Sequence, residues 1–226
     1  MQHERALVWD LPVRITHWLL VLGVSGSWIT HYAGPAWFAW HRRCGYVVLV
    51  LVAFRIAWGF VGTRYARFAA FLRGPRAIAA WLRAGARRTP GHNPLGALNV
   101  VALLLLLLIQ GLTGLFSNDE ISSAGPLYGW ISHESSNRLS SLHRANKVWL
   151  LVLIGLHVAA VAWYALVRRQ ALVRAMISGR SDAAGLAAED SIRDSQIGRA
   201  VLIVLALGAL LAILVRFAPQ ASVALF

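Results

Sequence analysis

The chain has 226 residues, of which 58% are hydrophobic and only 14% are charged. This composition is unusual for a soluble globular domain and is typical of an integral membrane protein. The formal net charge of +13 would also suit a nucleic-acid-binding protein, but the basic residues fall between apolar segments rather than on one polar face, so we expect no nucleic-acid partner.

Five apolar runs are long enough to cross the hydrocarbon core of a bilayer, which takes about 20 residues in a helix. They predict transmembrane helices at residues 12–30, 39–61, 95–117, 142–167 and 197–216. Few positive charges precede the first run, and no small-residue cleavage site follows it. We therefore expect a retained helix rather than a signal peptide.

Arginines concentrate in the connections that follow the second and the fourth predicted spans. The positive-inside rule places both connections in the cytoplasm, and hence the N-terminus inside and the C-terminus outside. We predict an all-α integral membrane protein with a four-helix transmembrane core in residues 1–167. A cytoplasmic connection follows in residues 168–196, and a fifth transmembrane helix with a short external tail occupies residues 197–226.

Four histidines lie in or at the ends of these spans. His143 and His157 are fourteen residues apart, which in a helix is about 40° short of four turns with a rise of about 21 Å, so they share one face at two depths. His17 lies near the cytoplasmic end of the first span and His41 at the external end of the second. The depths pair His17 with His157, and His41 with His143. A lone membrane histidine can instead hydrogen-bond a neighbouring helix.

Two histidine pairs at two depths of a helical bundle suit two six-coordinate b-type haems, because imidazole is a good iron ligand and bundle cores hold such cofactors. The single cysteine, Cys44, excludes the C-x-x-C-H attachment signature of c-type haem, so both haem b groups are expected to be non-covalent. His31 is an alternative to His41, since it lies fourteen residues after His17. We favour His41 because the first helix should end near His31, which then contacts a propionate or an external substrate.

Arg55 is a charged residue within an apolar span, where it needs a partner. It lies fourteen residues after His41, at the level of the His17 and His157 pair. We predict that it binds a haem propionate, with Arg14 at the inner boundary as a second candidate. The alternative is that Arg55 extends to the cytoplasmic surface.

A quinone needs an apolar slot with a few polar groups. Near the cytoplasmic histidine pair the candidates are Arg14, His92, Asn93 and Asn99. Gln110, deeper in the third span, is expected to bond another helix.

Sequence motifs extend along nearly the whole chain. They are VWDLPVRITHW, HRRCGYVVLVLVAFRIAWGFVG, GHNPLGAL, LHRANK and GLHVAAV. Together they resemble the bacterial di-haem cytochrome b561 family, which includes the b-type cytochrome subunits of nickel–iron hydrogenases. In that family the first, second and fourth helices supply the haem ligands, which the resemblance carries over to His17, His41, His143 and His157.

The resemblance implies a protein of the bacterial inner membrane, surrounded by lipid, that transfers electrons between the quinone pool and a periplasmic redox partner. That partner would be a c-type cytochrome or a hydrogenase-like enzyme. The fifth helix departs from the usual four-helix core of the family and leaves the subfamily open.

Two other functions suit some of these residues. The first is a superoxide:quinone oxidoreductase, in which an external patch attracts a small anion. The patch consists of Arg42, Arg43, Arg144 and Lys147, with His31. The second is a non-haem ion or proton transporter that uses the intramembrane histidines and Arg55 as a relay.

Overall fold

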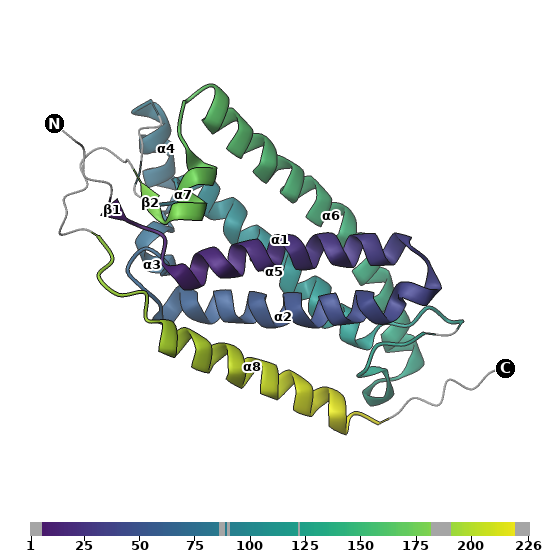
Figure 1. Cartoon of the computed structure of the whole chain (residues 1–226). Helices are drawn as coiled ribbons and strands as arrows, with labels where there is room; N and C mark the ends of the chain where they lie inside the picture. Colours follow the sequence, from purple (N-terminus) through teal and green to yellow (C-terminus); the bar gives the residue numbers. More distant parts are fainter. Residues whose placement is uncertain (1–5, 86–88, 90, 122, 182–190, 220–226) are drawn as a thin grey trace. The chain divides into compact units, whose positions relative to one another are not determined.

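The computed structural model describes residues 6–85, 89, 91–121, 123–181 and 191–219, which are mostly helical (Figure 1). The five long helices are α1 (Leu11–Tyr32), α2 (Phe38–Val61), α5 (Pro94–Phe116), α6 (His133–Leu166) and α8 (Ile197–Phe217). The short elements are helices α3 (Phe68–Phe71), α4 (Pro75–Arg83) and α7 (Leu172–Ser178), 3-10 helices η1 (Pro35–Trp37) and η2 (Tyr128–Trp130), and strands β1 (Ala6–Leu7) and β2 (Arg180–Ser181).

Each long helix overlaps one of the predicted spans. Four of them, namely α2 together with η1, α5, α6 and α8, are long and apolar enough to cross a membrane. Helix α1 is not in that group, because its apolar residues are interrupted by Arg14, His17 and several hydroxyl side chains. Helix α6 begins at His133 rather than at residue 142, since its polar first turns are helical too. The predicted fold class is thus confirmed in part.

The contacts between residues divide the chain into two compact units, and each of the five long helices contributes to both. Unit 1 comprises Met1–His17, Arg55–Leu103 and Leu153–Val201. Unit 2 comprises Trp18–Phe54, Leu104–Val152 and Leu202–Phe226.

Asp10 is the central polar residue of unit 1 and is only 1% exposed. Its Oδ1 accepts the backbone N–H of Val13 at 2.7 Å, so Asp10 is the N-cap of α1. Its Oδ2 accepts the Trp58 Nε1–H at 3.0 Å and the hydroxyl of Thr63. One buried carboxylate therefore joins the start of α1 to the end of α2.

Replacing Asp10 with alanine is expected to destabilise the protein by about 2–4 kcal/mol, because three buried donors lose their acceptor and α1 loses its cap. Thermal unfolding of the purified protein in detergent measures the loss. Asp194→Ala is the matched control, since Asp194 also accepts a backbone N–H, from Gln196, but is exposed. Equal unfolding temperatures for the two variants would contradict this role of Asp10.

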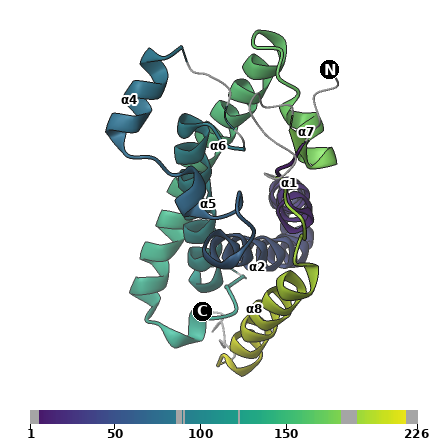
Figure 2. The ribbon, with the colours of Figure 1, turned by 90° about the vertical axis from the view of Figure 1, so that its left-hand side faces the viewer.

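The N-terminal segment of unit 1 pairs with the segment that follows α7. Strands β1 and β2 are antiparallel, and the carbonyl of Gly179 accepts the N–H groups of Val8 and Trp9. Gly179 has a φ of +81°, and a Cβ there would lie 2.7 Å from a Leu7 methyl carbon, so the position requires glycine. Figure 1 shows α7, β1 and β2 together at the start of α1, and the turned view in Figure 2 shows α7 beside α1.

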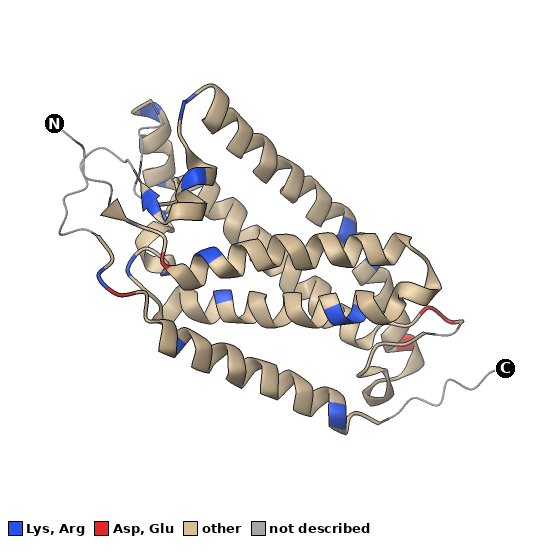
Figure 3. Cartoon of the chain, in the orientation of Figure 1, with Lys and Arg blue, Asp and Glu red and all other residues tan. Residues whose placement is uncertain are grey.

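This pairing adds a small sheet that the all-helical prediction missed. The predicted connection, residues 168–196, contains α7 and β2, while residues 182–190 and 220–226 lie outside the described residues. Arginines of unit 1 lie on α4, at the end of α6, on α7 and on β2 (Figure 3).

In unit 2, an apolar cluster of Leu49, Leu115 and Leu127 joins α2 and α5 to the segment before α6. Asn118 adds a polar link, because its Nδ2 donates to the Ser136 hydroxyl at 2.6 Å. The Ser136 hydroxyl donates in turn to the carbonyl of Phe116 at 2.7 Å. These bonds hold the first turns of α6 against the end of α5.

Candidate functional site

His17 of α1 and His157 of α6 lie close together in unit 1. Their ring centres are 6.4 Å apart, and the ring planes are inclined by 51°. A metal–nitrogen bond is about 2 Å long and the ring centre lies about 1 Å further on, so two imidazoles on opposite sides of one metal ion have ring centres about 6 Å apart. The observed separation fits a single six-coordinate iron between the two histidines.

Arg55 of α2 is buried in the same unit, at 6% exposed, and does not extend to the surface. Its Nη1 donates to the carbonyl of Ala66 at 3.2 Å, and its guanidinium carbon lies 5.7 Å from the centre of the Phe68 ring. Within the described part of the chain, its Nη2 is buried without a hydrogen-bond acceptor. A buried guanidinium with a free donor suits a carboxylate such as a haem propionate.

Arg14 has a similar free donor. Its Nη1 donates to the carbonyl of Ile177 at 2.5 Å, whereas its Nε is buried and finds no acceptor among the described residues. Arg14 and Arg55 therefore both retain a buried N–H group that an anionic ligand of unit 1 would satisfy.

His92 lies between two aromatic rings in unit 1. Its ring centre is 4.7 Å from that of Trp9 and 4.6 Å from that of Phe71. Burial lowers the pKa of His92 well below its usual value, and the positive charge of Arg55 lowers it further, with smaller effects of His157 and His17. His92 is therefore neutral at pH 7, and a neutral imidazole is both a donor and an acceptor.

The other predicted quinone contacts of unit 1 differ in their roles. The side-chain oxygen of Asn93 accepts the backbone N–H of Gly96 at 2.7 Å, so Asn93 caps α5. Asn99 lies six residues further along the chain, in α5, and is half-buried.

His41 of α2 and His143 of α6 lie in unit 2, and His41 and His31 are electrostatic neighbours of His143. The Nδ1 of His41 lies 2.8 Å from the carbonyl oxygen of Ser27, and the Nδ1 of His143 lies 3.0 Å from that of Gln110. Because a carbonyl only accepts, each Nδ1 carries the proton and each Nε2 is the unprotonated nitrogen that a metal would bind. In this structure the Nε2 of His143 accepts an N–H of the Gln110 side chain.

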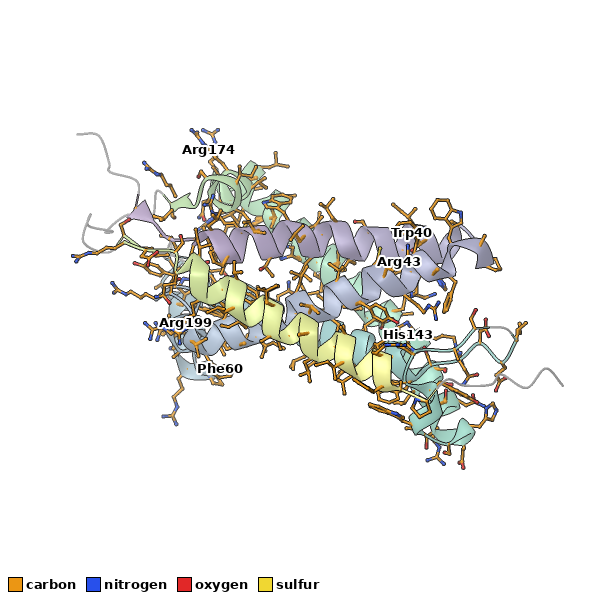
Figure 4. All side chains as sticks on the ribbon, turned by 60° about the horizontal axis from the view of Figure 1, so that its bottom comes forward. Trp40, Arg43, Phe60, His143, Arg174 and Arg199 are labelled. Atoms are coloured by element: carbon orange, nitrogen blue, oxygen red, sulfur yellow. The ribbon has the colours of Figure 1, made fainter. Side chains whose placement is uncertain are left out.

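His143, labelled in Figure 4, has polar neighbours on α5, namely Gln110 and Thr113. The Nε2 of the Gln110 side chain lies 3.0 Å from the Nε2 of His143, and the Gln110 side-chain oxygen accepts an N–H of Asn146 at 2.7 Å. The expectation that Gln110 bonds another helix is therefore confirmed. A Cβ at Gly114 would lie 3.0 Å from the His143 ring, so this position must stay small.

His31 lies beside this site but is held differently. Its ring centre is 5.6 Å from that of His41 and 4.8 Å from that of Tyr32, and its side chain is exposed. Among the described residues, no hydrogen bond orients the ring of His31, in contrast to His41.

The residues that sequence reasoning missed are those that hold the histidines and helix ends in place. Asp10 precedes the first apolar run and follows the N-cap rule, which could have identified it. Thr113 and Asn146, beside His143, had no signal of their own, because isolated polar residues in an apolar span occur for many reasons.

The chain is similar to known proteins along most of its length. Residues 8–179 match the family model for prokaryotic cytochrome b561, and the match ends before α8. A protein of Azotobacter chroococcum mcd 1 is 28% identical over 209 residues, which cover 76% of this chain and 86% of the relative. A protein of Rhizobium leguminosarum bv. viciae is 24% identical over 216 residues, which cover 79% and 90%. Both are named as probable Ni/Fe-hydrogenase B-type cytochrome subunits. No solved structure gives a significant match.

Proposed function

Because the chain belongs to the prokaryotic cytochrome b561 family, and is thus a membrane b-type cytochrome, we propose that it carries electrons across the membrane through two haem b groups. The observation that carries the proposal is the 6.4 Å separation of the His17 and His157 rings. His41 and His143 form the second pair in this proposal. Helix α6 then supplies one ligand to each haem, fourteen residues apart.

Haem iron held by two imidazoles has no open position and therefore supplies one-electron transfer rather than oxygen binding. The chain's own residues place the group and balance its charge. Arg55 and Arg14 would hold the propionates of the haem at His17 and His157. These propionates would accept from the two buried arginine N–H groups that find no acceptor among the described residues. Membership of a cytochrome family argues against the non-haem transporter.

We place quinone exchange in unit 1, near the His17 and His157 pair. His92 and Asn99 supply hydrogen bonds to the quinone oxygens, while Trp9 and Phe71 supply the apolar walls. Asn93 contributes with its amide nitrogen, because its oxygen caps α5.

We place the redox partner on the periplasmic side, at unit 2. The names of the relatives favour a hydrogenase-like enzyme as this partner. The N-terminus is then cytoplasmic, and the protein lies in the inner membrane of a bacterium, as the arginine-rich connections favour.

Oxidation of superoxide is the second candidate function, since exposed basic residues lie near the second pair. Arg42 and Arg43 are exposed, and the Lys147 ammonium lies 5.5 Å from the Tyr32 ring beside His31. A basic rim of this kind attracts small anions.

A pyridine haemochrome assay with a protein determination tests the main proposal. We expect two haem b per chain, and rapid reduction of the haems by a quinol. A folded protein without a Soret band would refute the proposal. Rapid reduction by superoxide with no partner protein present would favour the second candidate instead.

A further inference from the structure

The two histidines of unit 2 are held by the same local arrangement on two different helices. On α1, the carbonyl of Ser27 takes the Nδ1–H of His41 at 2.8 Å. Three residues later, the hydroxyl of Thr30 donates to the carbonyl of Gly26 at 2.6 Å and lies 3.2 Å from the carbonyl of Ser27.

On α5, the carbonyl of Gln110 takes the Nδ1–H of His143 at 3.0 Å. Three residues later, the hydroxyl of Thr113 donates to the carbonyl of Ile109 at 2.7 Å and lies 3.2 Å from the carbonyl of Gln110. Offsets and distances thus repeat those on α1. Thr113 adds one contact, because its hydroxyl oxygen also lies 3.2 Å from the His143 Nδ1.

A threonine hydroxyl has a physical effect on the helix in which it lies. A hydroxyl that bonds the carbonyl four residues earlier competes with the helix bonds and bends the helix. A helical carbonyl has two lone pairs, so the carbonyls of Ser27 and Gln110 can accept a histidine N–H from another helix. The threonine hydroxyl that also donates to each of these carbonyls makes it a weaker acceptor for that N–H. Thr30 and Thr113 are 8% and 5% exposed, so water does not compete for these bonds.

We propose that Thr30 and Thr113 are paired positioning residues of the His41 and His143 site, which set the basicity of both imidazoles and so the midpoint potential of the haem that they hold. The inference rests on the proposed function. A stronger acceptor at Nδ1–H makes the imidazole a more basic ligand and favours ferric iron, which lowers the potential. Loss of either hydroxyl removes a competing donor, strengthens the carbonyl as an acceptor and therefore lowers the potential. The same arrangement orients the ring of His41 but, among the described residues, not that of His31, so it favours His41 as the haem ligand.

The test is an optical redox titration of the purified full-length protein with Thr30→Val, with Thr113→Val and with both substitutions. Each single change is expected to shift the reduction equilibrium of the same one of the two haems about threefold to tenfold toward the ferric form, or about 30–59 mV for one electron. In the double variant the shifts add. The other haem keeps its potential.

Ser117→Ala is the matched control, because the Ser117 hydroxyl donates to the carbonyl of Gly114 at 3.1 Å and has no hydrogen bond to a histidine among the described residues. Ser117→Ala should leave both midpoint potentials unchanged. Thr113→Ser keeps a hydroxyl at this position and should therefore have the wild-type midpoint potential. If the Thr113→Val variant fails to fold, the midpoint potentials of the Thr30→Val variant still test the proposal.

Shifts in two different haems, or no shift with two haems bound, would overturn the inference while leaving the proposed function intact. A wild-type protein without haem would instead defeat the proposed function.

Discussion

Replacing His157 with alanine is expected to reduce the haem content from about two per chain to about one. In the proposed site His157 and His17 would both ligate one haem iron, so this variant would keep only one of the two ligands that hold the haem. His143→Ala should remove the other haem for the same reason. The pyridine haemochrome assay, with a redox titration of the haem that remains, measures both losses.

His133→Ala is the control on the same helix, because His133 is exposed and hydrogen-bonds Tyr128 at 3.1 Å outside the proposed sites. It should retain two haems. His41→Ala and His31→Ala separate the two candidates for the remaining ligand, and only the first should lose a haem. Retention of both haems in the His157→Ala variant would refute the assigned ligands.

Replacing Arg55 with leucine is expected to lower the midpoint potential of the haem at His17 and His157. A positive charge near the haem stabilises the ferrous form, and at a separation of about 8 Å with an effective dielectric constant of about 20 its contribution is about 2 kcal/mol. That energy corresponds to about 90 mV for a one-electron couple. An optical redox titration resolves the shift, and the other haem should keep its potential.

Two further substitutions test whether the positive charge of Arg55 causes the shift in potential. Arg55→Lys keeps the charge and should retain most of the potential. Arg76→Leu removes an exposed arginine of the same unit, on α4, and should leave both potentials unchanged. If Arg55→Leu left both potentials at their wild-type values, Arg55 would be bound to something other than a haem propionate.

The positions of the long helices could be predicted from the sequence because apolar runs form helices by local interactions alone. The runs at residues 39–61 and 95–117 differ from α2 and α5 by a single residue at their ends. The polar start of α6 was missed, because no apolar signal marks residues 133–141. Strands β1 and β2 were missed for a related reason, since each has only two residues and exists only through its pairing.

The helical spacing of His143 and His157 was likewise a local property, and so was the charge of Arg55. Which groups meet these side chains depended on packing between distant segments. The closeness of His17 to His157, the burial of Arg55 and the carbonyls that orient His41 and His143 were decided by tertiary structure. A helix fixes the direction of each side chain from its own hydrogen bonds, whereas the partner of that side chain comes from whichever helix packs against it.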